Sequence, residues 1–286
     1  MQCEQQLASD GVVLLENVLS QSFIDRFSAE YAKFDATLCG EEKTKDPLVV
    51  FWKHVEGELK RTVSLKKCPI LEAFILNDLV RILTFQFPKI SRLQLLECII
   101  FNKPPLISNT LNWHQDVAYF PLKPNNQIAV WFPLEFVSRE RGAMQYALGS
   151  HKSGAMGSTN LHTRAPFDGE QRPLIPDDPA RAGYKVQTFE MRPTDLLVHD
   201  GYTWHQSGPN VEEGHTRKGV SIRFVTTEAT FDPRPGQGAA FTKQISVAPG
   251  DLLPDCSAFL ADSITSITIN GSTSDLFDFF IILFDL

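Results

Sequence analysis

The sequence predicts a mainly β protein with flanking α-helices, built as a β-barrel or a double-sheet jelly roll. Two observations support this prediction. Apolar residues recur at helical spacing within the first 92 residues. From about Leu93 the chain instead carries short apolar runs separated by Pro, Gly and Asn, which is typical of antiparallel sheets.

The first part of the chain predicts one strand and two helices. Gly11–Leu15 is a short β-branched apolar run between turn-forming residues, which indicates a strand. Ser20 is a candidate N-cap, and the apolar residues after it keep helical spacing as far as Tyr31. Pro69–Phe85 has apolar residues on one helical face and a proline where a first turn tolerates it.

Six runs beyond residue 92 have the length and composition of strands. They are Leu95–Phe101, Ile128–Phe132, Gln145–Leu148, Val186–Phe189, Asp195–His199 and Val220–Thr226. Gly154–Ala182 is the longest stretch without periodicity and is rich in Pro, Gly and Asp. Long loops of this kind are often lids or binding loops, and we expect one here.

Length and composition are those of a folded globular protein. The 286 residues are 43% hydrophobic and 21% charged, which excludes a disordered or fibrous chain. We expect a single domain, with a mostly helical part at residues 1–92, a β core at 93–230 and a C-terminal extension at 231–286. The net charge of −7 argues against a nucleic-acid partner, because such proteins usually carry a basic face.

Five cysteines are scattered along the chain without a CxxC pair. This favours reduced thiols in a cytoplasmic protein over a disulfide framework or a thiolate metal site. The polar segment Met1–Asp10 has no apolar core of a signal peptide. The longest apolar run, Phe279–Phe284, is too short to span a bilayer, so we expect no stable membrane insertion. We expect the protein to be a monomer or a homodimer.

Two short segments carry residue types that bind metals. In an extended backbone His114 and Asp116 aim at a common point, because residues two apart share a face. His205 follows a predicted strand and the turn at Asp200-Gly201. Two imidazoles and one carboxylate can occupy one face of an octahedral ion and leave the other open, as in non-haem Fe(II) oxygenases. An HxD pair alone often occurs by chance, so the second histidine matters.

A cation follows the second histidine. Arg217 can hold a carboxylate with two parallel hydrogen bonds, which the adjacent Lys218 cannot do. Arg223 is a rival, because strand alternation puts it on the same face as Arg217. The spacing from His205 favours Arg217.

These segments resemble the phytanoyl-CoA dioxygenase family of Fe(II)- and 2-oxoglutarate-dependent oxygenases. The resemblance runs from about Asp10 to Phe231, and the order and spacing of its blocks are specific. The blocks are Asn102-Lys103-Pro104-Pro105, His114-Gln115-Asp116, Tyr119-Phe120-Pro121 with Pro124, Trp131, Gly149-Ser150-His151-Lys152-Ser153-Gly154, and His205-Gln206-Ser207-Gly208-Pro209-Asn210 before Arg217-Lys218. Glu140-Arg141-Gly142 departs from the family's Asn-Gly-like turn, and the tail after about Gly250 has no counterpart.

The resemblance implies a double-stranded β-helix, a cupin-like jelly roll, with iron on His114, Asp116 and His205. It implies that Arg217 binds the distal carboxylate of 2-oxoglutarate. Positions that line the cosubstrate pocket in the family correspond here to Gln115, Trp131, Ser207 and, less directly because a loop is shorter, Ile99. We expect substrate contacts from side chains near the ligands, with core packing as the alternative for the aromatic ones. These side chains are Tyr119, Phe120, Trp204 and Arg223. His151 and His199 are expected to be structural.

The resulting hypothesis is an Fe(II)- and 2-oxoglutarate-dependent dioxygenase of secondary metabolism. It would hydroxylate, desaturate or rearrange an unactivated C–H position of a small, largely apolar metabolite. 2-Oxoglutarate and O₂ would be consumed, giving succinate and CO₂, with ascorbate as a reductant. One alternative is a phytanoyl-CoA-type 2-hydroxylase of a fatty acyl-CoA, although the acidic chain suits a CoA ester less well. Further alternatives are a non-catalytic metal- or 2-oxoglutarate-binding module and a cupin-like Zn or Mn enzyme.

Overall fold

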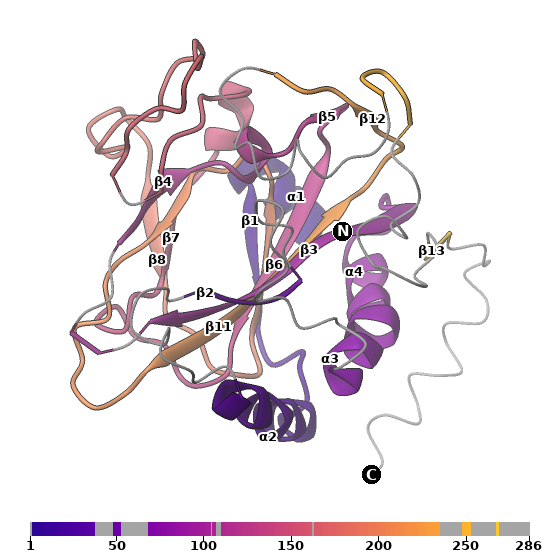
Figure 1. The fold of residues 1–286 in the computed structure, drawn as a ribbon, viewed down its shortest axis with the longest axis vertical. Helices are drawn as coiled ribbons and strands as arrows, with labels where there is room; N and C mark the ends of the chain where they lie inside the picture. Colours follow the sequence, from indigo (N-terminus) through magenta and orange to yellow (C-terminus); the bar gives the residue numbers. More distant parts are fainter. Residues whose placement is uncertain are drawn as a thin grey trace.

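A computed structural model describes residues 2–37, 48–52, 68–103, 105–106, 110–161, 163–234, 248–252 and 267–268. In this part of the chain two antiparallel sheets face each other, and helices cover the outer side of the larger sheet (Figure 1). None of the helices described is long and apolar enough to cross a membrane. The run Phe279–Phe284, Pro104 and most of the expected C-terminal extension lie outside the described residues.

The predicted helices are present. α2 (Gln21–Thr37) follows Ser20, whose hydroxyl accepts a hydrogen bond from the Phe23 amide at 3.1 Å, as an N-cap does. The predicted helix from Pro69 to Phe85 is one continuous helical segment. It comprises α3 (Pro69–Ala73), the π-helical turn η2 (Phe74–Leu79) and α4 (Val80–Gln86). A further helix, α1 (Gln2–Asp10), was not predicted because its sequence is polar and buries no side chain.

The larger sheet contains strands from both parts of the chain. Its order is β1 (Val12–Leu15), β9 (Leu196–Asp200), β6 (Gln127–Pro133), β11 (Arg217–Val225), β3 (Arg92–Lys103) and β13 (Ile267–Thr268), with β2 (Leu48–Trp52) also paired to β3. The smaller sheet has the order β4 (Leu111–His114), β10 (His205–Ser207), β7 (Met144–Ala147) and β8 (Val186–Phe189). A two-stranded ribbon pairs β12 (Thr230–Phe231) with β5 (Leu122–Lys123). All six predicted strands are observed.

Strand alternation divides the larger sheet into a core face and a cavity face. On β6, Phe132 points outward into the main apolar core, where it contacts Phe74 of η2 at a ring-centroid distance of 5.7 Å. Phe74 in turn stacks on Phe23 of α2 at 4.0 Å. Trp131, between Val130 and Phe132, points inward instead. The helices therefore cover one face, and the other face is left for polar side chains.

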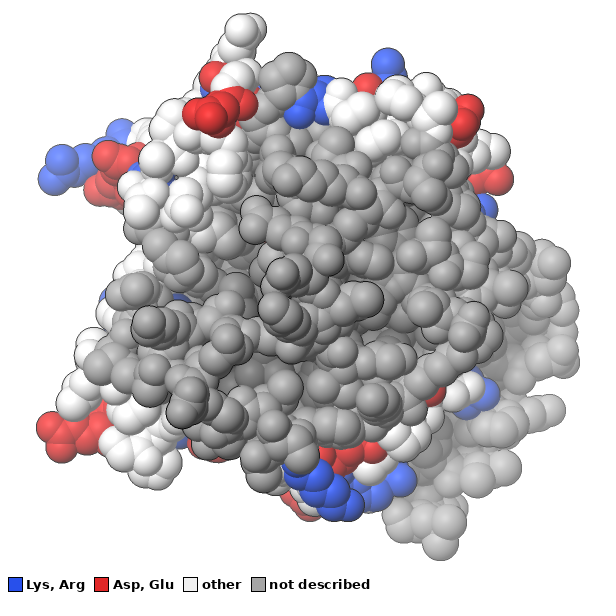
Figure 2. Space-filling view, viewed as in Figure 1, with Lys and Arg blue, Asp and Glu red and all other residues white. Residues whose placement is uncertain are grey.

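The described surface has mixed charge. In Figure 2, the basic and acidic side chains of described residues are interspersed around the margin of this face. Among the residues described there, we see no patch of one sign.

Candidate metal centre

The two predicted metal-binding segments meet in the smaller sheet. His114 ends β4, His205 begins β10, and the two residues are directly opposite each other in the antiparallel pair. Their ring centroids are 4.1 Å apart. Asp116 opens a 3₁₀ turn, η3 (Asp116–Tyr119), but the residue before it is extended, so its side chain returns to the face of His114. One ligand atom from each of the three lies within 4.8 Å of the others.

The protonation states of this triad suit a divalent metal. The Nδ1 of His114 lies 2.7 Å from the carbonyl of Asn112, and the Nδ1 of His205 lies 2.9 Å from that of Thr203. A carbonyl only accepts, so Nδ1 carries the hydrogen and Nε2 is left as the metal ligand. Burial lowers the pKa of both histidines, which keeps the rings neutral.

Asp116 is held as a carboxylate. Burial raises its pKa, but the charge of Arg223 and the hydrogen bond from His199 outweigh burial and hold the pKa well below the usual value. The Nη2 of Arg223 lies 2.8 Å from Oδ1, and the Nε2 of His199 lies 3.1 Å from Oδ2. Two neutral imidazoles and one ionised carboxylate, all buried, fit an iron(II) ion in a facial arrangement.

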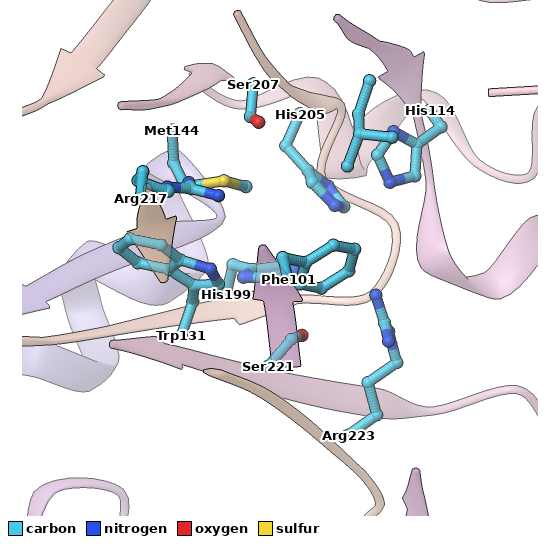
Figure 3. A pocket seen from close by; sticks show the side chains of 11 residues that line it. Phe101, His114, Trp131, Met144, His199, His205, Ser207, Arg217, Ser221 and Arg223 are labelled. Atoms are coloured by element: carbon cyan, nitrogen blue, oxygen red, sulfur yellow. The ribbon is translucent and has the colours of Figure 1, made fainter. Parts of the chain in front are cut away.

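Two members of the triad, His114 and His205, line one part of a cavity, and Asp116 is bonded to the lining residues Arg223 and His199. The cavity is lined by Phe101, Leu111, His114, Trp131, Met144, His199, His205, Ser207, Arg217, Ser221 and Arg223. Figure 3 shows Arg217, Trp131 and Met144 together on one side, His114 and Arg223 on the other, and His205 and Phe101 between them. Alternation puts both arginines of β11 on the cavity face, and their separation of six residues along the strand puts them at opposite ends.

The Arg217 end contains donors that the protein does not satisfy. Arg217 is 2% exposed and donates from Nη2 to the carbonyl of Gly142 at 3.1 Å, but its Nε has no hydrogen-bond partner. The buried hydroxyl of Ser207 has none either. An unsatisfied buried polar group costs about 1–3 kcal/mol. A ligand carboxylate in the cavity would satisfy both, so this end fits the distal carboxylate of 2-oxoglutarate.

Trp131 holds the guanidinium in place. The indole ring lies 4.6 Å from the Cζ of Arg217, a cation–π contact in a desolvated site. Gly219, two residues along β11, has no side chain, and a Cβ there would collide with the indole ring. Burial lowers the pKa of Arg217 to about 9, so the group stays protonated at neutral pH.

Lys103 is a second buried basic side chain, which the sequence identified only as part of the block Asn102-Lys103-Pro104-Pro105. It is paired with Arg217 across β3 and β11, and its Nζ donates to the carbonyls of Ser207 at 3.0 Å and Gly208 at 2.5 Å. Burial, with a smaller effect of Arg217, lowers its pKa to about 6. Lys103 therefore ties the end of β10 to β3 and leaves the positive charge at this end to Arg217.

Two expected cosubstrate contacts are not in the cavity lining. Gln115 faces the opposite way from its neighbours. Its amide donates to the carbonyls of Gly154 and Tyr202 at 2.8 and 2.7 Å, and its oxygen accepts from the Met156 amide at 2.8 Å. Ile99 is buried on the cavity side of β3, but Phe101, two residues on, is the side chain that reaches the cavity. A contact of Gln115 or Ile99 with the cosubstrate stays a prediction.

Two of the expected substrate contacts pack elsewhere. Trp204 alternates away from His205 and joins Trp113 in a separate apolar cluster outside the cavity. Phe120 belongs to the main core. Both side chains lie in apolar clusters, as the core-packing alternative expects, and their contact with substrate stays a prediction.

Tyr119 and Arg223 do lie beside the triad. The ring of Tyr119 contacts that of His114 edge-on at 6.1 Å, and its hydroxyl donates to the carbonyl of Thr159 at 2.8 Å. Arg223 is bonded to Asp116. Their contact with substrate stays a prediction.

The long irregular segment Gly154–Ala182 packs over the cluster of Trp113 and Trp204. Met156 and Ile175 enter that cluster. The segment is held internally by Glu170, whose carboxylate accepts from the amide and hydroxyl of Ser158 and from Arg172. The loop is thus an ordered cover beside the triad, tied to it through Gln115 and Tyr119.

Sequence comparison settles the family. The family model described as "Phytanoyl-CoA dioxygenase (PhyH)" matches residues 7–219. The chain belongs to this family. The peroxisomal phytanoyl-CoA dioxygenase of Mus musculus is 26% identical over 255 residues, which cover 77% of this chain and 66% of the mouse protein. The Homo sapiens enzyme is 24% identical over 247 residues, covering 78% and 67%. The chain thus spans about two thirds of these relatives.

Solved structures with this fold include two enzymes of nogalamycin biosynthesis. The non-haem α-ketoglutarate-dependent carbocyclase SnoK is 20% identical, with a TM-score of 0.64 over 88% of this chain and 92% of SnoK. The epimerase SnoN, solved with Fe³⁺, α-ketoglutarate and nogalamycin RO, is 17% identical, with a TM-score of 0.62 over 95% of each chain. The predicted double-stranded β-helix is confirmed. Family membership also confirms the predicted class, an iron- and 2-oxoglutarate-dependent dioxygenase.

Proposed function

We propose that this chain oxidises an unactivated C–H position of a small, largely apolar metabolite, with iron held by His114, Asp116 and His205. One observation carries the proposal: the triad histidines His114 and His205 line the same cavity as Arg217, whose buried Nε has no protein partner. A metal ligand set and a buried arginine in one cavity are the two features that a chelating dicarboxylate requires. Bound iron, with 2-oxoglutarate and O₂, supplies the oxidising power and yields succinate and CO₂.

The residues of the chain bind, orient and exclude water. Arg217, supported by Trp131, and the hydroxyl of Ser207 would hold the distal carboxylate of the cosubstrate. Burial of these groups strengthens the charge–charge attraction, because no water competes for the guanidinium. The neutral Nε2 atoms of both histidines need lose no proton before a metal binds.

The apolar side chains of the cavity support an apolar substrate. Phe101 and Leu111 line the cavity, and Tyr119 of η3 lies edge-on to the ring of His114. SnoK and SnoN act in the biosynthesis of a natural product, which supports a role in secondary metabolism. The runner-up is a fatty acyl-CoA, supported by relatives named phytanoyl-CoA dioxygenase.

We further propose a single cytoplasmic domain that acts as a monomer or homodimer. The scattered cysteines support a reducing compartment, and Cys3, Cys68 and Cys98 are free thiols. Strands from residues 1–92 complete the larger sheet, which supports one folding unit. Size-exclusion chromatography with light scattering would measure the oligomeric state.

The purified chain tests this function in two steps, an anaerobic binding measurement followed by a turnover measurement with O₂. Anaerobic addition of Fe(II) and 2-oxoglutarate should produce visible metal–keto-acid charge-transfer absorption. With O₂, a panel of apolar metabolites and fatty acyl-CoA esters should raise succinate formation for one class. Absorption without succinate for any substrate would favour a binding module. Absence of both would contradict the proposal, and metal analysis of the isolated protein would then identify a Zn or Mn protein.

A further inference from the structure

Two buried residues that are not metal ligands form a chain behind Asp116. The Nε2 of His199 lies 3.1 Å from Oδ2 of Asp116, and its Nδ1 lies 3.1 Å from the hydroxyl of Tyr146. All three side chains are at most 2% exposed. His199 comes from β9 of the larger sheet and Tyr146 from β7 of the smaller one, so the chain bridges the two sheets.

The hydrogen bond to the metal ligand has one possible direction. A carboxylate only accepts, so the Nε2 of His199 donates to Asp116. The Nδ1 of His199 is bonded to the Tyr146 hydroxyl, and this second bond orients the ring. Burial raises the pKa of Tyr146, so the phenol keeps its proton. Each member therefore orients the next.

Tyr146 also contacts a second metal ligand. Its ring stacks on that of His205, with centroids 5.6 Å apart and an interplanar angle of 26°. The two residues are directly paired between β7 and β10. One tyrosine thus restrains the ring of His205 directly and the carboxylate of Asp116 through His199.

We propose that His199 and Tyr146 are positioning residues that make Asp116 a one-oxygen ligand. This inference rests on the proposed iron and 2-oxoglutarate function. Two imidazoles, one carboxylate oxygen and a chelating keto acid use five of six octahedral positions and leave one open. A carboxylate that turned to bind through both oxygens would fill the sixth. The bond from His199 to Oδ2 opposes that turn, and Tyr146 keeps His199 in the donating orientation.

Three variants test the chain, with one matched control. Tyr146→Phe removes only the hydroxyl and keeps the ring on His205. His199→Phe removes the donor, whereas His199→Gln retains an amide that can donate to Oδ2. Tyr184→Phe is the control, because its hydroxyl bonds Ser153 at 2.6 Å outside the cavity. Circular dichroism and thermal unfolding show which variants fold.

The readouts are Co(II) binding to the apoprotein, measured by calorimetry, and the visible spectrum of the Co(II) protein, which reports coordination number. Tyr146→Phe and His199→Phe should weaken Co(II) binding by about 10- to 100-fold, as loss of a group that orients a ligand does. His199→Phe should also change the spectrum and weaken 2-oxoglutarate binding to the Co(II) protein. His199→Gln should recover part of each effect, and Tyr184→Phe should match wild type.

The inference is overturned if folded Tyr146→Phe and His199→Phe proteins keep the wild-type Co(II) affinity and spectrum. If His199→Phe does not fold, Tyr146→Phe and His199→Gln decide the question by the same measurements. Failure of the proposed function is a separate result: wild-type protein itself would then give no metal–keto-acid absorption with Fe(II).

Discussion

At the triad end of the cavity, both oxygens of Asp116 and the Nδ1 of His114 and of His205 already have protein partners. At the other end, the Nε of Arg217 and the hydroxyl of Ser207 have none. The protein therefore orients its metal ligands by its own hydrogen bonds, whereas the Arg217 end is completed only by a ligand. Substitutions at the triad end should weaken metal binding, whereas substitutions at the Arg217 end should weaken only the binding of 2-oxoglutarate.

The largest effect is expected at Asp116. Asp116→Ala removes the anionic ligand and leaves Arg223 without this carboxylate, so turnover should fall below detection. Breaking a buried ion pair from one side also costs about 3–5 kcal/mol of stability. Asp116→Asn keeps the shape and separates the two effects, with exposed Asp168→Ala as the control. Turnover at more than a trace level in either Asp116 variant would remove Asp116 from the proposed ligand set.

Arg217 should affect only the cosubstrate. Arg217→Met removes a charge-assisted bond worth about 1.5–3 kcal/mol, so the Kd for 2-oxoglutarate should rise by about 10- to 100-fold. Co(II) binding without 2-oxoglutarate should be unchanged. Arg217→Lys should recover only part of the affinity, because an ammonium lacks the paired geometry. A large loss of Co(II) affinity in a folded Arg217→Met protein would contradict the separation of the two ends.

A smaller effect of the same kind is expected at Gly219. In Gly219→Ala the new Cβ meets the indole of Trp131 and displaces it from under Arg217. The Kd for 2-oxoglutarate should rise by less than it does in Arg217→Met, with Co(II) binding unchanged. Combining Gly219→Ala with Trp131→Phe, which shortens the side chain, should relieve part of the defect. Additive losses in the double variant would argue against a clash with the indole.

The smallest effect concerns pH at the triad end. A histidine with the ordinary pKa of about 6.5 is half protonated at pH 6.5, so two such ligands would lose about fourfold in metal affinity relative to pH 8. Burial lowers the pKa of His114 and His205, so the rings remain neutral there and the loss should be smaller. Co(II) calorimetry between pH 6.5 and 8 measures it. A fourfold or larger loss would show that the rings titrate normally.

Much of this fold could be predicted from apolar residues that recur every second position in strands and about every 3.6 positions in helices. Alternation along β11 predicted that Arg217 and Arg223 share a face, and the apolar runs predicted the strands. The same rule, applied to the neighbours of the ligands, would have placed Gln115 and Trp204 away from the cavity. Resemblance instead suggested a role for Gln115, and nearness to the ligands suggested one for Trp204; the structure places both side chains outside the cavity lining.

The contacts of His199 and Tyr146 could not be predicted from the spacing of residues along the sequence. His199 faces Asp116 because β9 pairs with β6 in a register that no local pattern specifies. Tyr146 reaches His205 through the pairing of β7 with β10, and it reaches His199 because the two sheets face each other. Sequence patterns specify which face a side chain occupies on its own strand, but the partners across a cavity depend on sheet pairing and on the separation of the sheets.

Gln115 stands between two metal ligands and holds the backbone of Gly154, Met156 and Tyr202 with three hydrogen bonds. The covering loop therefore cannot lift at Gly154–Met156 without breaking two of those bonds. The same amide side chain thus supports the segment Gly154–Met156 and the peptide that joins His114 to Asp116, so the order of that segment and the orientation of two metal ligands share one anchor.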